Sequence, residues 1–320
     1  MPDESLVDQI TAGLAETGVA AARRWADLEQ SWSHDVLVEA ASAVMSRPVW
    51  DLTDIGPVGM VTGSGGMVVR LPNVSTLAAL VASCMPGITV VKPGSLASRS
   101  RVAGPAGLAV RLGLATPKNA GQLRRMLERD RFAILPTEEL YPWLNQPETF
   151  TVPLLCEAVE TASFQPCTAH WKVNGVVDPT PAVHRARAHQ SSGQRILVVH
   201  GTTDVAGWVI DDVSIAGPTC FLDGEGRHWS VPPEEFGTRR VSARELVVPQ
   251  DLAPEQVFES VLSGTAPRAW IELVAASAAA VLLHAEVVSD LAEGFAAARE
   301  VIRSGVAAAK LRRLQELFSD

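Results

Sequence analysis

Apolar positions in the first part of the chain recur at helical spacing. Ala and Leu recur through Leu6–Ala26, and apolar residues return at the same spacing over Asp35–Ser46, which predicts that the N-terminal part is helical. Pro48 is expected to end this part, because the residue before a proline avoids the helical conformation.

After this proline the pattern changes to short apolar runs of the kind that form buried parallel strands. We expect strands at Val58–Thr62, Ile88–Val91, Phe132–Leu135 and Ile196–Val199. Helices are expected between them at Ser75–Ala82, capped by Asn73 or Ser75, at Ala106–Leu112, and from the cap Thr116-Pro117 to about Glu128. This alternation predicts an α/β protein with a mostly parallel central sheet and helices on both faces.

The region between the third and fourth predicted strands has a different character. Residues 136–181 are rich in proline, which predicts irregular structure or a crossing between domains. Further on, Thr219–Leu222 and His228–Val231 flank the turn sequence Asp223-Gly224-Glu225-Gly226, and this pattern predicts a β-hairpin.

The C-terminal part is expected to be helical from Pro254 onward. We expect three helical segments, with Ser289 as a cap and Gly305 as a break. The longest apolar stretch, Trp270–Val288, is interrupted by polar residues, so it predicts a buried amphipathic helix and no membrane span.

Composition narrows the function classes. Hydrophobic residues make up 47% of the 320 residues and aromatics only 5%, as in helix-rich α/β proteins whose cores use Ala, Val and Leu. The net charge of −9 disfavours nucleic-acid binding. Cys84, Cys156, Cys167 and Cys220 lack metal-site spacing and are expected to be small buried apolar residues. The N-terminus is acidic and has no signal-peptide pattern, so a soluble cytoplasmic protein is expected.

Two segments have the chemistry of a phosphate site. The glycines of Gly63-Ser64-Gly65-Gly66 follow a predicted strand and allow backbone amides to approach an anion closely; an ordinary tight turn is the alternative. Asn73-Val74-Ser75-Thr76 lies where a helix is expected to begin, and a helix N-terminus attracts phosphate; simple capping is the alternative.

Charged residues occur at two further places, directly after the predicted strand Ile88–Val91 and after the apolar residues Trp208-Val209-Ile210. Lys92 comes at the sheet edge where ligands of open α/β proteins bind, and it can neutralise a phosphate; an exposed strand-end lysine is the alternative. In a loop, Asp211 and Asp212 can both reach a Mg²⁺ ion that bridges to phosphates, whereas a solvated acidic turn is the alternative. There is no credible Ser-His-Asp triad, and His200 is interpreted as a strand terminus.

Taken in order, these segments resemble the motifs of anthranilate phosphoribosyltransferase and its relatives, the pyrimidine nucleoside phosphorylases. The family's Gly-Thr-Gly-Gly-Asp is similar to Gly63–Met67, its Asn-Ile-Ser-Thr to Asn73–Thr76, and its Lys-His-Gly-Asn-Arg to Lys92–Leu96. Its Asp-Glu-Val-Ser, followed by Gly-Pro-Thr, is similar to Asp211–Ser214 and Gly217–Thr219. The resemblance extends from about residue 35 to the end of the chain.

The resemblance implies a helical domain of residues 1–50, completed by part of 140–170, joined to an α/β domain of residues 51–320, and a homodimer formed through the helical part. It implies Mg²⁺-assisted transfer of ribosyl phosphate from phosphoribosyl pyrophosphate to a small-molecule acceptor, which needs no covalent nucleophile. The implied donor-binding residues are Gly63, Ser64, Gly65, Gly66, Asn73, Ser75, Thr76, Lys92, Gly94 and Ser100. The implied catalytic residues are Lys92, Asp211 and Asp212, the metal-binding residues are Ser75, Asp211 and Asp212, and the acceptor-binding residues are Pro93 and Ser95.

Several positions depart from the family pattern. Met67 replaces an aspartate, and Pro93 and Ser95 replace the His and Asn that face the aromatic acceptor. No arginine occurs between Arg131 and Arg185, where the family carries the arginine that recognises the carboxylate of anthranilate. An acceptor other than anthranilate is therefore expected.

Three interpretations follow. The first is a phosphoribosyltransferase of specialised metabolism, with Trp143, Phe164 and Trp171 either lining its acceptor pocket or packed in the core. The second is a nucleoside phosphorylase, which would depend on orthophosphate. The third is a non-catalytic descendant that binds or scaffolds; Met67 and Pro93 favour it, whereas the retained charge of Lys92 and both aspartates counts against it.

Overall fold

The central element of the fold is a mixed β-sheet. The computed structural model describes residues 4–16, 18–64, 69–96, 103–141, 164–180 and 194–316. The strands are β1 (Gly59–Thr62), β2 (Val90–Gly94), β3 (Phe132–Pro136), β4 (Trp171–Gly175), β5 (Arg195–Thr202), β6 (Val209–Ile210), β7 (Thr219–Asp223) and β8 (His228–Val231). Their order is β3-β2-β1-β4-β5-β7-β8, with β6 paired to β5.

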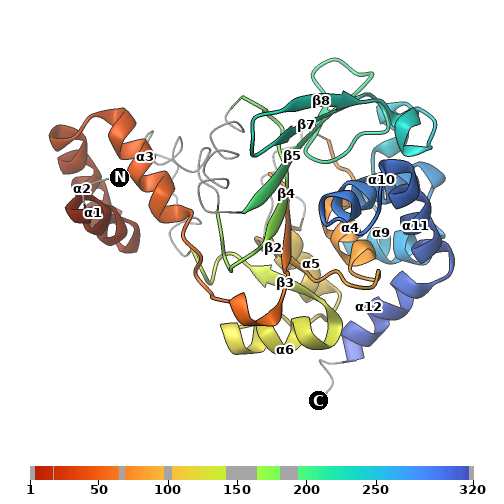
Figure 1. The fold of residues 1–320 in the computed structure, drawn as a ribbon, viewed down its shortest axis with the longest axis horizontal. Helices are drawn as coiled ribbons and strands as arrows, with labels where there is room; N and C mark the ends of the chain where they lie inside the picture. The colour runs from red at the N-terminus through yellow and green to blue at the C-terminus, as the bar shows by residue number, and fades with distance from the viewer. Residues whose placement is uncertain are drawn as a thin grey trace.

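The pairing of the strands divides the sheet into two parts. Strands β3, β2, β1, β4 and β5 are parallel, whereas β6 and β7 pair with β5 in antiparallel fashion and β8 continues the sheet as a hairpin with β7 (Figure 1). The mostly parallel α/β sheet and the hairpin predicted from the sequence are both confirmed. Because the parallel strands share one direction, the loops after them gather at one edge.

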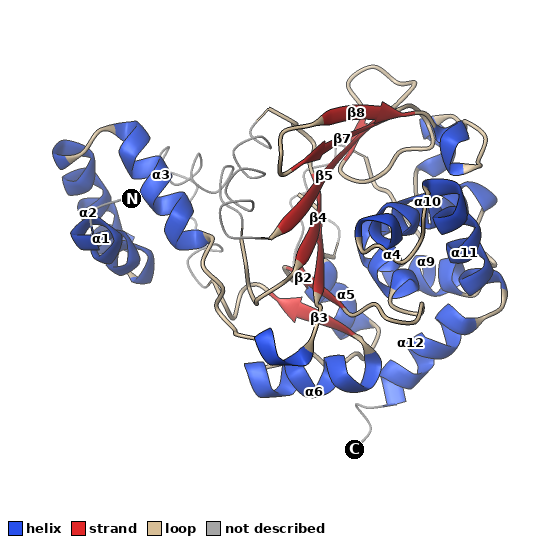
Figure 2. Cartoon of the chain, in the orientation of Figure 1, coloured by secondary structure: helices blue, strands red, loops and turns tan. Residues whose placement is uncertain are grey.

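Helices cover both faces of the sheet (Figure 2). The helices of the larger layer are α4 (Val74–Ala82), α5 (Pro105–Arg111), α9 (Pro254–Leu262), α10 (Arg268–His284), α11 (Leu291–Arg303) and α12 (Val306–Glu316). Helix α10 is apolar on almost every side and packs between α4 and α11. Helix α6 (Ala120–Asp130) lies on the opposite face, where Leu123 and Leu127 pack against apolar residues of β1, β2 and β3.

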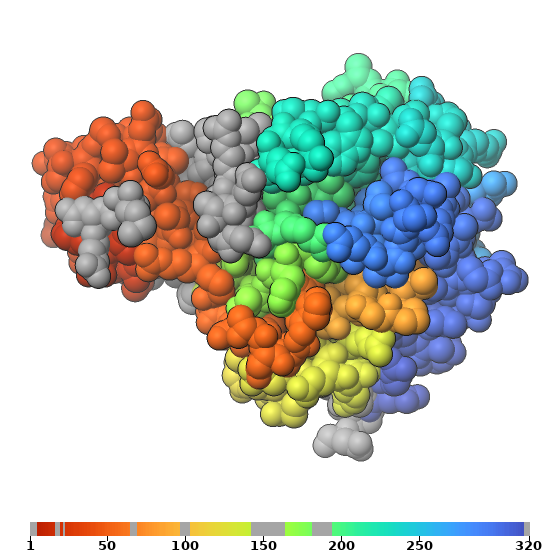
Figure 3. Space-filling view, in the orientation of Figure 1, coloured from red at the N-terminus to blue at the C-terminus, as the bar shows by residue number. Residues whose placement is uncertain are grey.

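The N-terminal helices form a second hydrophobic cluster. Helices α1 (Glu4–Ala15), α2 (Gly18–Ser31) and α3 (His34–Met45) lie at one side of the α/β part and project from it in the space-filling view (Figure 3). Their buried residues, among them Leu6, Trp25 and Leu37, pack on one another. The predicted helical character is confirmed, although Leu6–Ala26 is divided by a break after Ala15.

Strand β4 is the main correction to the predicted elements, since residues 136–181 were expected to be irregular or to cross between domains. Trp171 and Val173 face the helical layer, whereas Lys172 and Asn174 alternate with them and point to the opposite face. All five residues of β4 are buried. Polar residues at alternate positions, between proline-rich flanks, concealed a central strand.

Several predicted boundaries also shift. Lys92 and Pro93 lie within β2, because this strand continues to Gly94 beside the full length of β3. The predicted cap Thr116 is wrong, since the Asn119 side chain accepts the Gln122 N–H at the start of α6. Residues 254–316 form four helices, and Asp290, one residue after the predicted Ser289, caps α11.

Gly305 forms the predicted break between α11 and α12. Its φ of 79° is a conformation that glycine adopts readily. Throughout the part of the chain that the structure describes, no helix is both long and apolar enough to cross a membrane.

The cysteines differ from the expectation that all are buried. Cys167 is buried and Cys84 half-buried, whereas Cys220 is exposed and Cys156 lies outside the described residues. Cys220 stands on β7 between the buried Thr219 and Phe221, so the alternation of the strand turns its side chain outward.

Candidate functional site

The candidate site lies at the edge of the sheet where the parallel strands end. Three segments meet there: the loop after β1, the first turn of α4, and the turn after β6. Ser64 Oγ donates a hydrogen bond of 2.9 Å to Asp211 Oδ2, which joins the first segment to the third. The structure therefore brings together residues separated by 147 positions.

Gly63 is the point of closest approach between these segments. A Cβ atom built at Gly63 would lie 3.2 Å from Asp211 Oδ2 and 3.4 Å from Ser75 Oγ. The glycine thus lets the carboxylate and the hydroxyl converge beside the backbone of the loop. The predicted donor-binding residues Gly65, Gly66 and Ser100, and the replacement Met67, lie outside the described residues.

The aspartates are delivered by the short antiparallel strand β6, which ends at Ile210 and is immediately followed by Asp211 and Asp212. Their turn is closed by Ser214, whose backbone N–H donates to Thr219 Oγ1 at 2.9 Å and whose Oγ accepts the Ala216 N–H at 3.1 Å. Buried hydrogen bonds of this kind hold the turn in one conformation.

Lys92 is a buried cation next to these carboxylates. Its side chain is one of the largest fully buried in the described chain, and Nζ donates to the carbonyl of Pro93 at 3.1 Å. Burial lowers the pKa of Lys92 to about 8, and the charges of Asp212 and Asp211 oppose that shift. The alternative of an exposed lysine at a strand end is therefore wrong.

Asp212 experiences the opposite shift. Burial raises its pKa well above the ordinary value and the neighbouring charge of Asp211 raises it further, whereas Lys92 and the backbone N–H of Ser75 lower it. Ser75 lies in the first turn of α4, so the N-terminal end of this helix points at a carboxylate. Asp211 itself is buried, with 4% of its surface exposed, which rules out a solvated acidic turn.

The remaining residues of the Asn73–Thr76 segment have structural contacts. Asn73 precedes the first residue of α4, but its side chain does not cap the helix; Nδ2 donates to the carbonyl of Ala103 at 3.2 Å. This bond ties α4 to the segment that precedes α5. The Thr76 side chain is buried, with 1% exposed, and is not presented at the surface of the site.

The predicted acceptor residues occupy different environments. Pro93 is buried within β2, whereas Ser95 is half-buried in the loop after it, where its carbonyl accepts the Ala106 N–H at 3.1 Å. Gly94, a predicted donor-binding residue, is packed against Pro105, which lies 2.2 Å from the position of a Cβ atom. Pro93 is therefore covered by the surrounding chain and is not exposed at the surface of the site.

Two polar residues that the sequence interpretation missed lie at the same edge. Glu138, in the loop after β3, accepts the backbone N–H of Leu96 through Oε1, and its Oε2 is buried without a hydrogen-bond partner among the described residues. Asn174, at the end of β4, accepts a 2.6 Å hydrogen bond from Thr62 Oγ1, and its Nδ2 is likewise unpaired within the described chain. The signal that could have found them is a polar residue next to an otherwise apolar strand.

The aromatic candidates and the histidine do not line a shared pocket in the described chain. Trp171 is buried in the main core and packs edge-on against His284, with ring centroids 6.2 Å apart. Phe164 packs edge-on against Tyr141 at 5.3 Å, and Trp143 lies outside the described residues. The interpretation of His200 as a strand terminus is wrong by two residues, because β5 continues to Thr202; His200 Nδ1 lies 3.1 Å from the carbonyl of Val176.

The acidic pair suits a metal ion of a particular kind. The described residues hold no cluster of three or more His, Cys, Asp and Glu side chains, which disfavours a site made of protein ligands alone. Two adjacent carboxylates, one with a raised pKa, together with the Ser75 hydroxyl fit a Mg²⁺ ion, which retains waters and shares its coordination with phosphate.

Comparison with known proteins agrees with this architecture. Residues 60–308 match the model of the glycosyl transferase family, a/b domain. The chain therefore belongs to this family, within the anthranilate phosphoribosyltransferase superfamily, whose members transfer pentosyl and phosphoribosyl groups.

Individual relatives are similar over most of their length. The chain is 28% identical to anthranilate phosphoribosyltransferase of Roseiflexus castenholzii, over 96% of this chain and 91% of the relative. It is 30% identical to that of Methylobacterium radiotolerans, over 90% and 83%. The enzyme from Thermus thermophilus superposes with a TM-score of 0.78 at 26% identity, covering 99% of this chain and 95% of the other.

A more distant structure shares the fold. Anthranilate phosphoribosyltransferase from Saccharomyces cerevisiae, in complex with PRPP and Mg, has a TM-score of 0.75 at 19% identity and covers 98% of this chain and 93% of its own. The phosphoribosyltransferase-like fold is thus common to this chain and to proteins of low sequence identity.

Proposed function

We propose that this protein is a phosphoribosyltransferase that moves ribosyl phosphate from phosphoribosyl pyrophosphate to a small-molecule acceptor other than anthranilate, with the help of Mg²⁺. The observation that carries the proposal is the buried charge set at the sheet edge, in which Lys92 lies beside Asp211 and Asp212. Lys92 and Asp211 are buried and Asp212 is half-buried, and the pKa is lowered for Lys92 and raised for Asp212. Ionisable groups are costly to bury, and groups with shifted pKa values cluster at functional sites.

The donor is proposed to bind across the loop after β1 and the start of α4. Backbone amides of Gly63 and Ser64 and the N-terminal end of α4 offer hydrogen-bond donors to phosphate oxygens. The Ser64–Asp211 hydrogen bond holds the loop against the acidic turn before substrate arrives. The S. cerevisiae relative was solved with PRPP and Mg, which supports this choice of donor.

Asp211, Asp212 and the Ser75 hydroxyl are the residues that would hold Mg²⁺. Burial and mutual repulsion raise the pKa of Asp212, so a divalent cation would offset an unfavourable negative charge at this point. When bound, the ion would neutralise charge on the pyrophosphate that leaves.

The protein's own part in the reaction is electrostatic. As the bond from the anomeric carbon to pyrophosphate breaks, positive charge develops on the sugar and negative charge on the leaving group. Lys92 in its ammonium form and the amides of the glycine loop stabilise the leaving oxygens, whereas the site holds the acceptor in line with the anomeric carbon. No covalent nucleophile is required.

The acceptor side lacks a carboxylate-binding arginine and carries an acid. The sequence has no arginine from residue 132 to residue 184, and Glu138 presents a buried, unpaired Oε2 in the described part of this edge. A carboxylate would be repelled there, whereas an N–H group would satisfy that oxygen. We therefore propose a neutral or cationic acceptor with an N–H donor, recognised by Glu138.

We also propose that the chain is organised into two domains. Residues 1–50, completed by part of 140–170, are taken as a helical domain that forms a homodimer, and residues 51–320 as the α/β domain that holds the site. The separate hydrophobic cluster of α1–α3 and the packing of Phe164 against it support this division.

The test is donor binding and its dependence on metal. Phosphoribosyl pyrophosphate should raise the unfolding temperature of the purified protein only when Mg²⁺ is present, and Asp211→Ala should abolish both this shift and any turnover in an acceptor screen followed by mass spectrometry. Glu225→Ala, which changes an exposed acid of the hairpin turn, is the matched control. A shift with orthophosphate and nucleoside consumption would instead identify a nucleoside phosphorylase, and no response to either donor would indicate a non-catalytic protein.

A further inference from the structure

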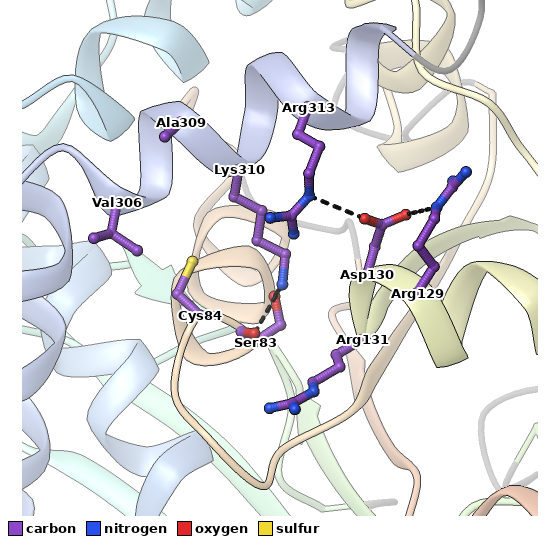
Figure 4. A pocket seen from close by; sticks show the side chains of 9 residues that line it. All are labelled: Ser83, Cys84, Arg129, Asp130, Arg131, Val306, Ala309, Lys310 and Arg313. Carbon is purple, nitrogen blue, oxygen red and sulfur yellow. Dashed lines mark hydrogen bonds and ion pairs between the residues drawn. The ribbon is translucent and has the colours of Figure 1, made fainter.

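A charged cavity lies at the opposite end of α4 from the candidate site. It has a volume of about 420 Å³ and opens between the C-terminal end of α4, the junction of α6 with β3, and α12 (Figure 4). Its lining residues are Ser83, Cys84, Arg129, Asp130, Arg131, Val306, Ala309, Lys310 and Arg313. Four of these side chains are basic and one is acidic.

The acid is already neutralised by two of the bases. Asp130 is buried, Arg129 Nε donates to its Oδ2 at 2.8 Å, and Arg313 Nε donates to its Oδ1 at 3.1 Å. Figure 4 shows these two arginines approaching the carboxylate from opposite sides. Both oxygens of Asp130 are therefore engaged, and each guanidinium retains further N–H donors.

Lys310 is engaged with the end of a helix. Its Nζ donates to the backbone carbonyl and to the Oγ of Ser83, both at 2.7 Å, at the C-terminal end of α4. Burial lowers the pKa of Lys310 to about 8; Arg313 and Arg131 also lower it, whereas Cys84 and Asp130 oppose the shift.

Arg131 supplies a further cation of this cavity. It ends α6 in the left-handed conformation, with φ of 55°, and its guanidinium makes no hydrogen bond or ion pair with any described residue. With Lys310 charged, the cavity holds four positive charges against the single negative charge of Asp130. A protein with a net charge of −9 thus concentrates positive charge in one hollow.

The wall opposite the arginines is apolar. Val306 is 47% exposed and Ala309 is exposed on the same face of α12, while Cys84 is half-buried at the end of α4. A cavity of this size with charge on one side and apolar atoms on the other has the layout of a small-molecule site.

We propose that this cavity binds a phosphorylated small molecule, with the phosphate between Arg131 and Arg313 and an apolar or aromatic group against Val306. Arginine suits this role because its planar fork matches the oxygens of a phosphate. The cavity is separate from the donor site: α4 spans nine residues, about 13 Å, between Ser75 at one end and Ser83 at the other.

Methyl resonances report binding at this location. In ¹H–¹³C spectra of the full chain, adenosine 5′-monophosphate should shift the Val306 and Ala309 methyl signals saturably, inorganic phosphate should shift them more weakly, and adenosine should leave them unchanged. Arg131→Asn, which tolerates the left-handed conformation, should weaken binding about tenfold or more. Arg312→Gln, an exposed change on the same helix outside the cavity, should bind like the native protein.

A further variant distinguishes binding in this cavity from binding at the donor site. Lys92→Met, which removes the cation of the donor site, should retain the Val306 and Ala309 shifts. If Arg131→Asn does not fold, Val306→Glu places a carboxylate on the apolar wall and should abolish binding. The proposal is overturned if adenosine shifts these signals as much as the monophosphate does, if millimolar monophosphate leaves them unmoved, or if neither variant weakens binding.

Discussion

The backbone carbonyl of Asp211 lies directly against Gly175, at the end of β4. A Cβ atom built at Gly175 would be 1.6 Å from that oxygen, which is far inside van der Waals contact. The acidic turn can therefore sit above the sheet only because residue 175 has no side chain.

Replacement of Gly175 should displace this turn. Gly175→Ala is expected to destabilise the protein by about 1–3 kcal/mol and to weaken Mg²⁺-dependent donor binding, because the Asp211 backbone must move. Urea unfolding and donor titration measure the two effects. Gly121→Ala, at a glycine without positive φ where a Cβ would come no closer than 3.4 Å to another atom, controls for the general effect of replacing a glycine. Unchanged donor binding in Gly175→Ala would contradict the position given to Asp211.

Lys92→Met should lower both stability and donor affinity. The apolar side chain removes one buried charge but leaves Asp211 and Asp212 without their neighbouring cation, so the variant should be less stable, and donor affinity should fall about tenfold or more. Chemical denaturation and calorimetry measure both quantities. The control Lys118→Met changes an exposed lysine paired with Glu139 and should leave donor affinity unaltered. A variant that binds donor normally would remove Lys92 from the proposed site.

Lys310 should make stability depend on pH. Its pKa is lowered from 10.5 to about 8 in the folded protein, so its contribution to stability is fully present above pH 10.5 and is lost as pH falls through about 8. Relative to Lys310→Met, the native protein should therefore gain up to about 3 kcal/mol between pH 8 and 10.5. Unfolding free energies of both proteins at several pH values test this, and parallel curves would refute it.

Glu138→Gln should alter acceptor use without altering donor binding. Its Oε2 is the buried acceptor atom proposed to receive an N–H group, so the amide should raise the acceptor KM several-fold and relax the exclusion of carboxylate-bearing acceptors. Steady-state kinetics with paired acceptors, with and without a carboxylate, measure the change. The neighbouring Glu139→Gln, which changes an acid bound to Lys118, serves as the control and should behave like the native enzyme. Equal KM values in the two variants would exclude this role for Glu138.

The sequence predicted the fold best where one physical signal acted alone. Short apolar runs gave β1, β2, β3 and β5, and the turn residues gave the β7–β8 hairpin. Strand β4 was not predicted because two of its buried residues, Lys172 and Asn174, are polar. Lys172 can be buried because its Nζ donates to the Phe164 carbonyl at 2.9 Å, and only folding brings that carbonyl near. Local patterns do not encode such pairings.

The candidate site was predictable in its residue types and less so in its geometry. Lys92 and Ser75 could be named because each follows or begins an expected element, and Asp211 because it follows a short apolar run. The burial of Lys92, in contrast, is a property of the folded chain. Asn73 was expected as a cap and instead reaches the Ala103 carbonyl, a partner 30 residues away. Glu138 was missed because the sequence does not show that its side chain accepts the backbone N–H of Leu96.

Helix α4 makes polar contacts at both ends, and each contact requires the helix to keep its rotation about its own axis. Its first turn presents the Ser75 amide to Asp212, and the carbonyl and hydroxyl of its C-cap residue Ser83 accept hydrogen bonds from Lys310 of α12. Because each residue of an α-helix turns it by about 100°, a single insertion or deletion within α4 would rotate one end away from its partner while the other stayed in place. The length of this helix is therefore expected to resist change more strongly than the identity of any one apolar residue on it.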